Sequence, residues 1–202
     1  MDYLGDRSGQ FKVVEQYHFT PKVENLISGS TGSLGGDLGY TLSRIPNHHR
    51  ALMAMMRLGE KLKTHQPYGA QYSIECWFER AIRFRPYDHT ARLIYVTFLI
   101  KNGRQPEVIN QLEIAKKIAG DNPFAHYNIG LIYFDLKNYD PALAQAHIAY
   151  GLGFDRPELR EKLKGIRQWK EFVETSSKPA PDVATQGAVD SAKPHVESTR
   201  LN

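Results

Sequence analysis

The sequence predicts an all-α protein, an α-solenoid of about four helical hairpins followed by a capping helix and a disordered tail. Three observations carry this prediction. Small and apolar residues recur with a step of thirty-four residues, the segments around them have helical periodicity, and an amphipathic segment with a strong helix start follows the last recurrence. Because one hairpin cannot bury its apolar face alone, we expect the hairpins to stack.

The recurrence is clearest in three alanines, which are Ala81, Ala115 and Ala149. Two further columns keep the same step, and they contain Ile74, Val108 and Ala142, and then Phe78, Leu112 and Ala146. A side chain larger than alanine would clash where two helices pass closest to each other. We therefore expect each alanine to mark a crossing between the second helix of one hairpin and its neighbour.

The last repeat shows the fullest pattern, in the strings Asn128–Tyr133 and Leu136–Leu143. It resembles the tetratricopeptide repeat (TPR) family, in which two antiparallel helices form one unit. The residues at matching family positions are Ile129, Gly130, Tyr133, Tyr139, Ala142 and Ala149. Two residues depart from the family pattern, since His126 stands where tryptophan is usual and Phe154 where proline commonly ends the unit.

Toward the N-terminus the match weakens while the periodicity continues. The other predicted helix pairs are 92–102 with 106–119, 49–63 with a helix that ends before Pro86, and two short helices between Thr20 and Pro46. Thr20 is expected to cap the first of these helices, and Gly29 to close it. We place the whole repeat domain at residues 20–174.

The two ends of the chain are predicted separately. Residues 1–19 are expected to be an extended lead-in, and residues 175–202, which contain no aromatic residue, a disordered tail. Between them, a helix that starts at Asp155 and ends near Glu174 is expected to cap the array, with its apolar face formed by Leu159, Leu163, Ile166 and Trp169. An amphipathic helix could instead dock on a membrane or a partner, but mixed charges favour the cap.

Composition narrows the function. With a net charge of +4 the chain is only mildly basic, and its basic residues are interleaved with acidic ones. This pattern argues against nucleic acid as a partner. The sequence contains no apolar stretch of about eighteen residues, so no membrane span is predicted. The single cysteine allows no intrachain disulfide. No acid pair, Ser/His/Asp set or Cys/His cluster stands at a convincing spacing, so we predict a protein without enzymatic activity, cofactor or metal.

A small-molecule or metal-binding protein is the alternative. It would use His18, His48 and His49 together with the glycine-rich loop 29–36. The loop lacks the Gly-Lys-Ser/Thr ending of a phosphate-binding loop. Adjacent histidines on a helix point about 100° apart, which prevents the usual shared grip on one metal. A flexible loop and a polar helix start are therefore the preferred interpretations.

The TPR resemblance implies that fixed positions of each first helix line an inner groove, where a protein or peptide partner binds. In the last unit the groove residues are Phe124, Tyr127, Leu131, Phe134 and Asp135. In the two units before it they are Thr90, Leu93, Thr97, Ile100 and Lys101, and Arg50, Met53, Arg57, Glu60 and Lys61. We expect a groove with a basic end and an aromatic end, suited to a peptide or helix with an apolar patch and flanking carboxylates. The Lys and Asn with which chaperone-binding members hold a C-terminal carboxylate are absent from the matching positions.

A second, looser resemblance lies near the N-terminus, in Tyr17–Glu24, Gly35–Leu42 and Pro46–Leu52. These strings look like a group of small exported proteobacterial TPR proteins of unassigned function. The resemblance implies export to the periplasm, and we expect the interaction module to serve there as an adaptor or assembly factor for an envelope complex. In that group a signal peptide precedes a segment like Asp2–Tyr3, whereas this chain starts without a charged and apolar leader. We therefore expect a mature form with an added Met1, or else a cytoplasmic protein.

Overall fold

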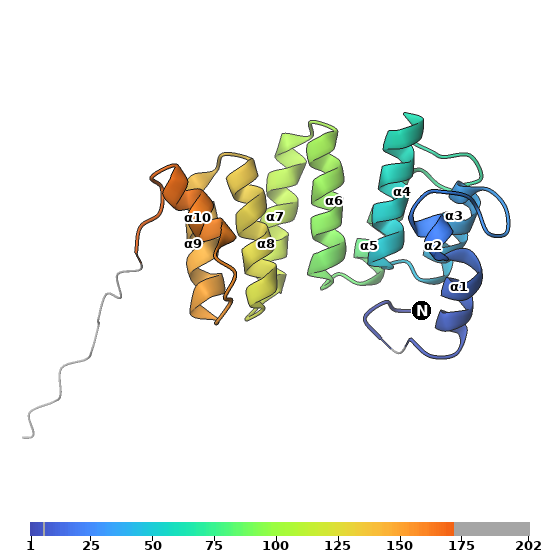
Figure 1. The fold of residues 1–202 in the computed structure, drawn as a ribbon, viewed down its shortest axis with the longest axis horizontal. Coiled ribbons are helices and arrows are strands. Elements are labelled where there is room, and N and C mark those ends of the chain that lie inside the picture. Colours follow the sequence, from blue (N-terminus) through green and yellow to red (C-terminus); the bar gives the residue numbers. More distant parts are fainter. Residues whose placement is uncertain (6, 172–202) are drawn as a thin grey trace, which may run out of the picture. The chain divides into compact units, whose positions relative to one another are not determined.

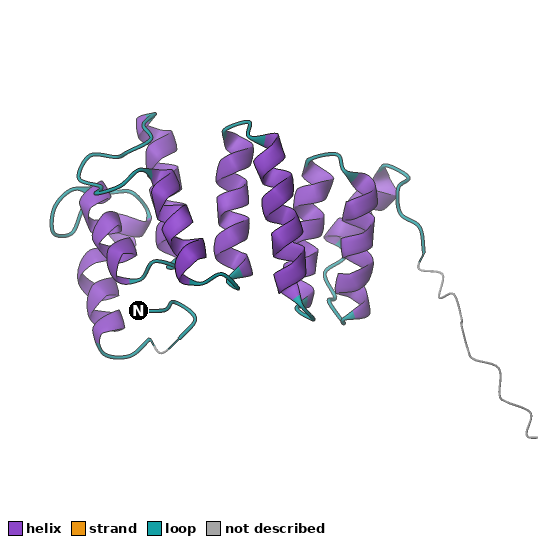
Figure 2. Cartoon of the chain, turned by 180° about the vertical axis from the view of Figure 1, so that it is seen from behind, coloured by secondary structure: helices purple, strands orange, loops and turns teal. Residues whose placement is uncertain are grey.

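The computed structural model describes residues 1–5 and 7–171 of the 202-residue chain. Helices cover 65% of the described residues and no strand occurs among them, which confirms the predicted all-α class (Figure 2). Met1–Lys170 form one compact unit. The predicted tail, 175–202, and the last residues of the predicted capping helix lie outside the described residues.

Ten helices are found in the described part of the chain (Figure 1). In chain order they are α1 (Gln10–His18), α2 (Pro21–Glu24), α3 (Leu34–Arg44), α4 (His49–Leu62), α5 (Ile74–Phe84), α6 (His89–Lys101), α7 (Gln105–Ala119), α8 (Pro123–Asp135), α9 (Tyr139–Gly151) and α10 (Glu158–Gly165).

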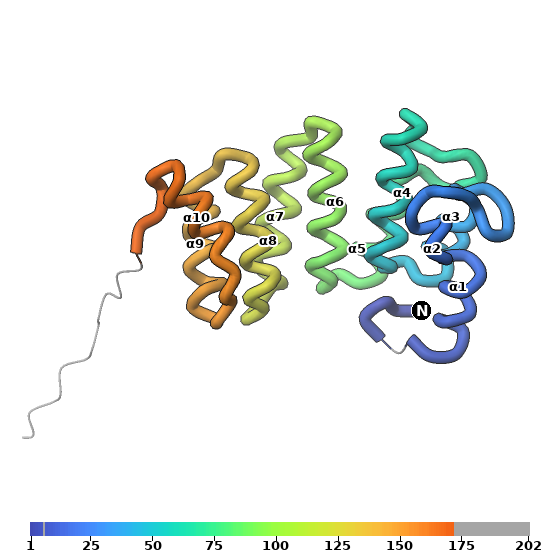
Figure 3. The backbone as a smooth tube through the Cα atoms, viewed as in Figure 1, coloured from blue at the N-terminus to red at the C-terminus, as the bar shows by residue number. Residues whose placement is uncertain are grey.

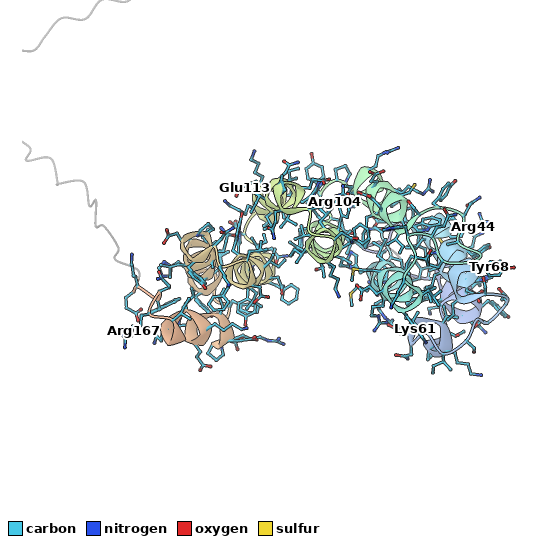
Figure 4. The ribbon with its side chains drawn as sticks, turned by 90° about the horizontal axis from the view of Figure 1, so that it is seen from above. Arg44, Lys61, Tyr68, Arg104, Glu113 and Arg167 are labelled. Carbon is cyan, nitrogen blue, oxygen red and sulfur yellow. The ribbon has the colours of Figure 1, made fainter. Side chains whose placement is uncertain are left out.

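The helices from α4 to α9 pack as antiparallel neighbours, with α6 against α7 and α8 against α9 in the closest pairs (Figure 3). Seen from above, Arg104 and Glu113, at the start and middle of α7, lie on one edge of Met1–Lys170, and Lys61 of α4 lies on the opposite edge (Figure 4). The helix α6 contacts both α4 and α8, so the three helices predicted to line a partner groove are neighbours.

The recurring columns form the core between the paired helices. All nine of their residues are buried, and Ala81, Ala115 and Ala149 expose no surface at all. At such contacts an alanine lets two helix backbones approach, which a larger residue would prevent. The predicted register of α5, α7 and α9 is thus the register that the structure has.

A polar bridge also recurs with the same step. The Arg92 guanidinium donates to the Gln111 side chain and to the carbonyl of Pro86, which ties α6 to α7 and to the end of the preceding unit. Thirty-four residues later the His126 ring lies 2.8 Å from the Gln145 side chain and 2.7 Å from the Gly120 carbonyl. Two positions thirty-four residues apart are thus filled by buried polar residues with equivalent partners.

Residues 1–19 are not an extended lead-in. They contain α1, whose buried residues Phe11 and Val14 pack with Tyr3 and Ile45 in a small separate cluster. Two apolar residues one helical turn apart are enough to bury a face when another segment covers them. Here α3 packs against α1, and the chain before α1 supplies the cover.

Two further predicted helices are shorter than expected. The helix after Thr20 is the single turn α2, because Leu26 adopts a left-handed conformation (φ 57°) and the Thr20 hydroxyl bonds that of Ser30 instead of capping the turn. The capping helix α10 ends at Gly165, and Arg167 (φ 59°) reverses the chain. This reversal stands Trp169 edge-on against the ring of His147, with centroids 5.0 Å apart.

Candidate functional site

An open apolar cavity of about 320 Å³ lies between α6 and α8. We call it the α6–α8 groove, and its lining residues are His89, Thr90, Leu93, Ile94, Thr97, Phe124, Asn128, Leu131 and Ile132. It forms because α7 packs against both helices, whereas α6 and α8 touch each other only sparsely. The space between α6 and α8 is therefore not filled by a neighbouring helix, and the side chains that line it stay accessible.

Five of the predicted groove residues are brought together here, namely Thr90, Leu93, Thr97, Phe124 and Leu131. Phe124 is 51% exposed, so half of its ring meets solvent. The polar lining groups are occupied locally, because the Thr97 hydroxyl donates to the Leu93 carbonyl (3.1 Å) and the Asn128 amide to that of Phe124 (2.7 Å). Burial lowers the pKa of His89, which keeps this ring neutral at neutral pH. The groove is thus an uncharged, mainly apolar surface.

Tyr127 does not face this groove, and its predicted exposure is wrong. Its side chain is buried against Phe154, with the ring centroids 4.4 Å apart, and burial raises the pKa of its hydroxyl. Phe134 is half-buried, with its ring 5.6 Å from that of Tyr139 and the Lys162 ammonium 5.5 Å from its centre. The prediction placed this stripe on the groove face, but the chain after α9 returns to cover this part of α8.

The predicted basic end of the groove is occupied by the chain itself. Arg50 donates to the Glu24 carboxylate (Nε to Oε1, 2.7 Å), Arg57 to the Glu24 carbonyl (2.8 Å) and Lys61 to the Leu26 carbonyl (3.2 Å). The hydrogen bond from Arg50 holds the pKa of Glu24 below its usual value. These three cations of α4 anchor the α2 segment and lie outside the lining of the α6–α8 groove, so their predicted role for a partner is not supported by this placement.

A second, smaller cavity of about 210 Å³ lies where α4 and α6 end. Its lining residues are Met56, Gly59, Glu60, Lys63, Thr64, His65, Ile74, Phe98, Lys101 and Asn102. We call it the α4–α6 pocket. Lys101 was predicted as a groove residue, and its ammonium lies 3.0 Å from the Glu60 carboxylate. Sequence reasoning missed Lys63 and His65, because they belong to the turn and loop after α4, which the repeat pattern does not cover.

The three histidines of the alternative interpretation are not gathered in one site. His48 contacts Glu15 (3.0 Å), His49 contacts Asp88 (2.8 Å) and His18 contacts Asp37 (3.0 Å). Within residues 1–5 and 7–171, no group of three or more His, Cys, Asp or Glu side chains is placed to hold a metal ion. Each ring instead joins two segments that are distant in the sequence.

The glycine-rich loop is organised by Asp37. This buried carboxylate accepts hydrogen bonds from the backbone amides of Ser30 (2.7 Å) and Thr31 (3.1 Å) and from the Thr31 hydroxyl (2.5 Å). The Thr31 hydroxyl and Asp37 both approach the same nitrogen of His18, Nδ1. In a catalytic triad the histidine contacts the nucleophile through one ring nitrogen and the acid through the other, which is not the arrangement here. These contacts instead fasten the loop to α1 and α3.

Comparisons with known proteins leave the family open, because no family model matches this chain and no curated protein matches it. No helix in the described part of the chain is long and apolar enough to cross a membrane. The α6–α8 groove, with the exposed ring of Phe124, is the candidate functional site.

Proposed function

We propose that this protein is a non-enzymatic interaction module built of stacked TPR-like hairpins. The hairpins are α4–α5, α6–α7 and α8–α9, the α1–α3 region forms a degenerate fourth unit, and α10 caps the array. Two features support the proposal. The alanine columns keep one step through three second helices, and the polar bridge of Arg92 recurs at His126 with equivalent partners. Leu159 of α10 packs on Gly130, at the place where a further repeat would begin.

The module binds a peptide or helix of a partner protein in the α6–α8 groove. The observation that carries this proposal is the exposure of Phe124 at the rim of an uncharged cavity lined by leucine and isoleucine side chains. Exposed aromatic rings beside an apolar hollow are typical of binding sites, and aromatic anchors dominate the energy of many interfaces. The cavity is large enough for one bulky apolar side chain of the partner, with Phe124 packing beside it.

We further propose that the protein is an adaptor or assembly factor for an envelope complex in the periplasm. The support is the resemblance of Tyr17–Glu24, Gly35–Leu42 and Pro46–Leu52 to exported proteobacterial TPR proteins. Expression of the natural gene followed by separation of periplasmic and cytoplasmic fractions tests this location. Recovery in the cytoplasmic fraction alone would contradict it.

The binding proposal is tested by selecting peptides from a displayed random library on the full chain. The selected peptides should contain a bulky apolar residue, and Phe124→Ala should weaken their binding by about tenfold or more, because a hot-spot aromatic is worth about 2 kcal/mol. Phe84→Ala is the matched control, since Phe84 is 46% exposed on α5 and lies outside the groove. Selected peptides that bind both variants equally, or a selection that enriches none, would refute the proposal.

A further inference from the structure

The α4–α6 pocket differs in chemistry from the α6–α8 groove. Its floor is apolar, formed by Met56, Ile74 and Phe98, while its rim carries the ammonium groups of Lys63 and Lys101. A cavity of this kind can receive a group that has an apolar stem and an anionic head. The groove beside it lacks a cation among its lining residues, so a bound segment that needs a charge partner would find it only in the pocket.

The charge of the pocket is only partly balanced. Its rim has two ammonium groups against one carboxylate, that of Glu60, which pairs with Lys101. Both partners of this pair are about half exposed, at 48% and 42%. Such exposed pairs contribute little to stability, so an incoming carboxylate can share or replace the contact of Glu60 at little cost.

The pocket and the groove are joined by α6. Thr97 lines the groove and Lys101 lines the pocket, and these residues are four positions apart on one face of the helix. Four helical residues advance by about 6 Å. The two cavities lie on opposite flanks of α6, which is about 10 Å wide with its side chains. An extended peptide advances by about 3.3 Å per residue, so about three or four of its residues span the crossing.

We propose that the partner segment crosses α6 and carries an Asp or Glu side chain about three or four residues from its apolar anchor, with that carboxylate bound by Lys63 and Lys101 in the α4–α6 pocket. This inference rests on the proposed function of the α6–α8 groove and adds the charge requirement of its ligand. It also moves the expected contact with carboxylates from Arg50, Arg57 and Lys61, which hold the α2 segment, to cations that line an open cavity.

The test uses the peptides selected on the full chain, resynthesised with an amidated C-terminus so that only side chains supply carboxylates. Changing the acidic residue to its amide should weaken binding to the parent protein by about tenfold. The double variant Lys63→Gln/Lys101→Gln should bind the acidic peptide about as weakly, and should no longer distinguish it from the amide form. Lys116→Gln/Lys117→Gln on α7 makes the same change in net charge away from both cavities and should leave binding unchanged.

Failure of this inference can be told apart from failure of the proposed function. Peptides that depend on Phe124 but bind equally in acidic and amide forms, or that require a free C-terminal carboxylate instead, would overturn the inference and leave the groove proposal standing. Peptides that lose nothing with Phe124→Ala would overturn both. Rising salt should weaken the acidic peptide and not its amide form, because the carboxylate contact is exposed to screening.

Discussion

The N-terminal region, residues 1–50, and the helices α6–α9 are held together by different means. In α6–α9 the contacts are mainly those of small and aliphatic residues in repeating columns, as at Ala115 and Ala149. The N-terminal region instead buries the polar side chains of Asp37, Asn47 and His48 almost completely. The helices α6–α9 share a repeated packing pattern with repeated polar bridges at Arg92 and His126, whereas the hydrogen bonds of the N-terminal region do not recur along the chain.

Asn47 shows how the N-terminal set works. Its amide oxygen accepts from the backbone amide of Tyr3 (2.9 Å), and its amide nitrogen donates to Asp2 (2.8 Å) and Asp88 (2.9 Å). The Tyr3 ring in turn lies 4.5 Å from that of His48. The three residues that bond Asn47 are all more than forty positions away from it in the sequence.

The two regions should be sensitive to different kinds of substitution. A buried polar group that loses its partner keeps the full cost of being removed from water, whereas a packed alanine column tolerates changes that preserve volume. Polar deletion should therefore damage the N-terminal region most, and enlargement of a side chain should damage the repeats.

The largest effect is expected for Asp37→Ala. Burial alone would raise the pKa of Asp37, but hydrogen bonds from Thr31, His18 and Ser30 outweigh it, so the residue is a well-satisfied carboxylate with a lowered pKa. Its removal leaves several donors without an acceptor and should reduce the free energy of unfolding by about 3 kcal/mol. Urea unfolding followed by far-UV circular dichroism measures this. Asp121→Ala, at an exposed site, is the control, and equal midpoints for the two variants would show that the loop is not held by Asp37.

A smaller loss is expected when the alanine column is overpacked. Ala149→Leu should cost about 1–3 kcal/mol, because Ala149 exposes no surface and the surrounding helices must move apart. Ala144→Leu in the same helix, where the side chain is exposed, should change stability little. Thermal melting of the two variants gives the comparison. A parent-like melting temperature for Ala149→Leu would mean that α9 does not pack on this column.

The smallest effect is expected from pH and concerns His48. Its Nδ1 accepts from the Ala51 amide at the start of α4, so its Nε2 carries the proton that faces Glu15. Burial, aided by the charges of Arg50, His49 and Arg7, lowers the pKa of His48 to about 3. Protonation then favours the unfolded state, where the pKa is near 6.5, so stability is complete above about pH 6.5 and falls as the pH drops toward 3.

Between about pH 7 and pH 5 this should remove about 1–2 kcal/mol from the free energy of unfolding. His48→Asn can still accept at the helix start, and should flatten this slope, leaving the smaller contribution of His89, whose pKa is also lowered by burial. His65→Asn, at an exposed loop position, should keep the parent slope. If His48→Asn follows the parent curve, the acid sensitivity arises elsewhere.

The helical class and the burial of the recurring columns could be predicted from the sequence. Ala81, Ala115 and Ala149, which follow the thirty-four-residue step, are all buried. Only a small side chain fits where two helices pass closest to each other, so the same residue type recurs at each such site. The groove was determined in part. Leu93, Thr97, Phe124 and Leu131 share the surface that their helical spacing predicts, since positions three and four residues apart fall on one face.

Which of those faces stay open depends on packing between segments that are distant in the sequence. Tyr127 has the same spacing as its neighbours but is covered by Phe154, and Arg50 is taken by Glu24 of the chain itself. The helix at Gln10–His18 likewise depends on cover from α3 and Tyr3. Periodicity reports which side chains lie together on a helix, whereas exposure depends on what segments distant in sequence return to cover them, and that return follows from the packing of the whole unit.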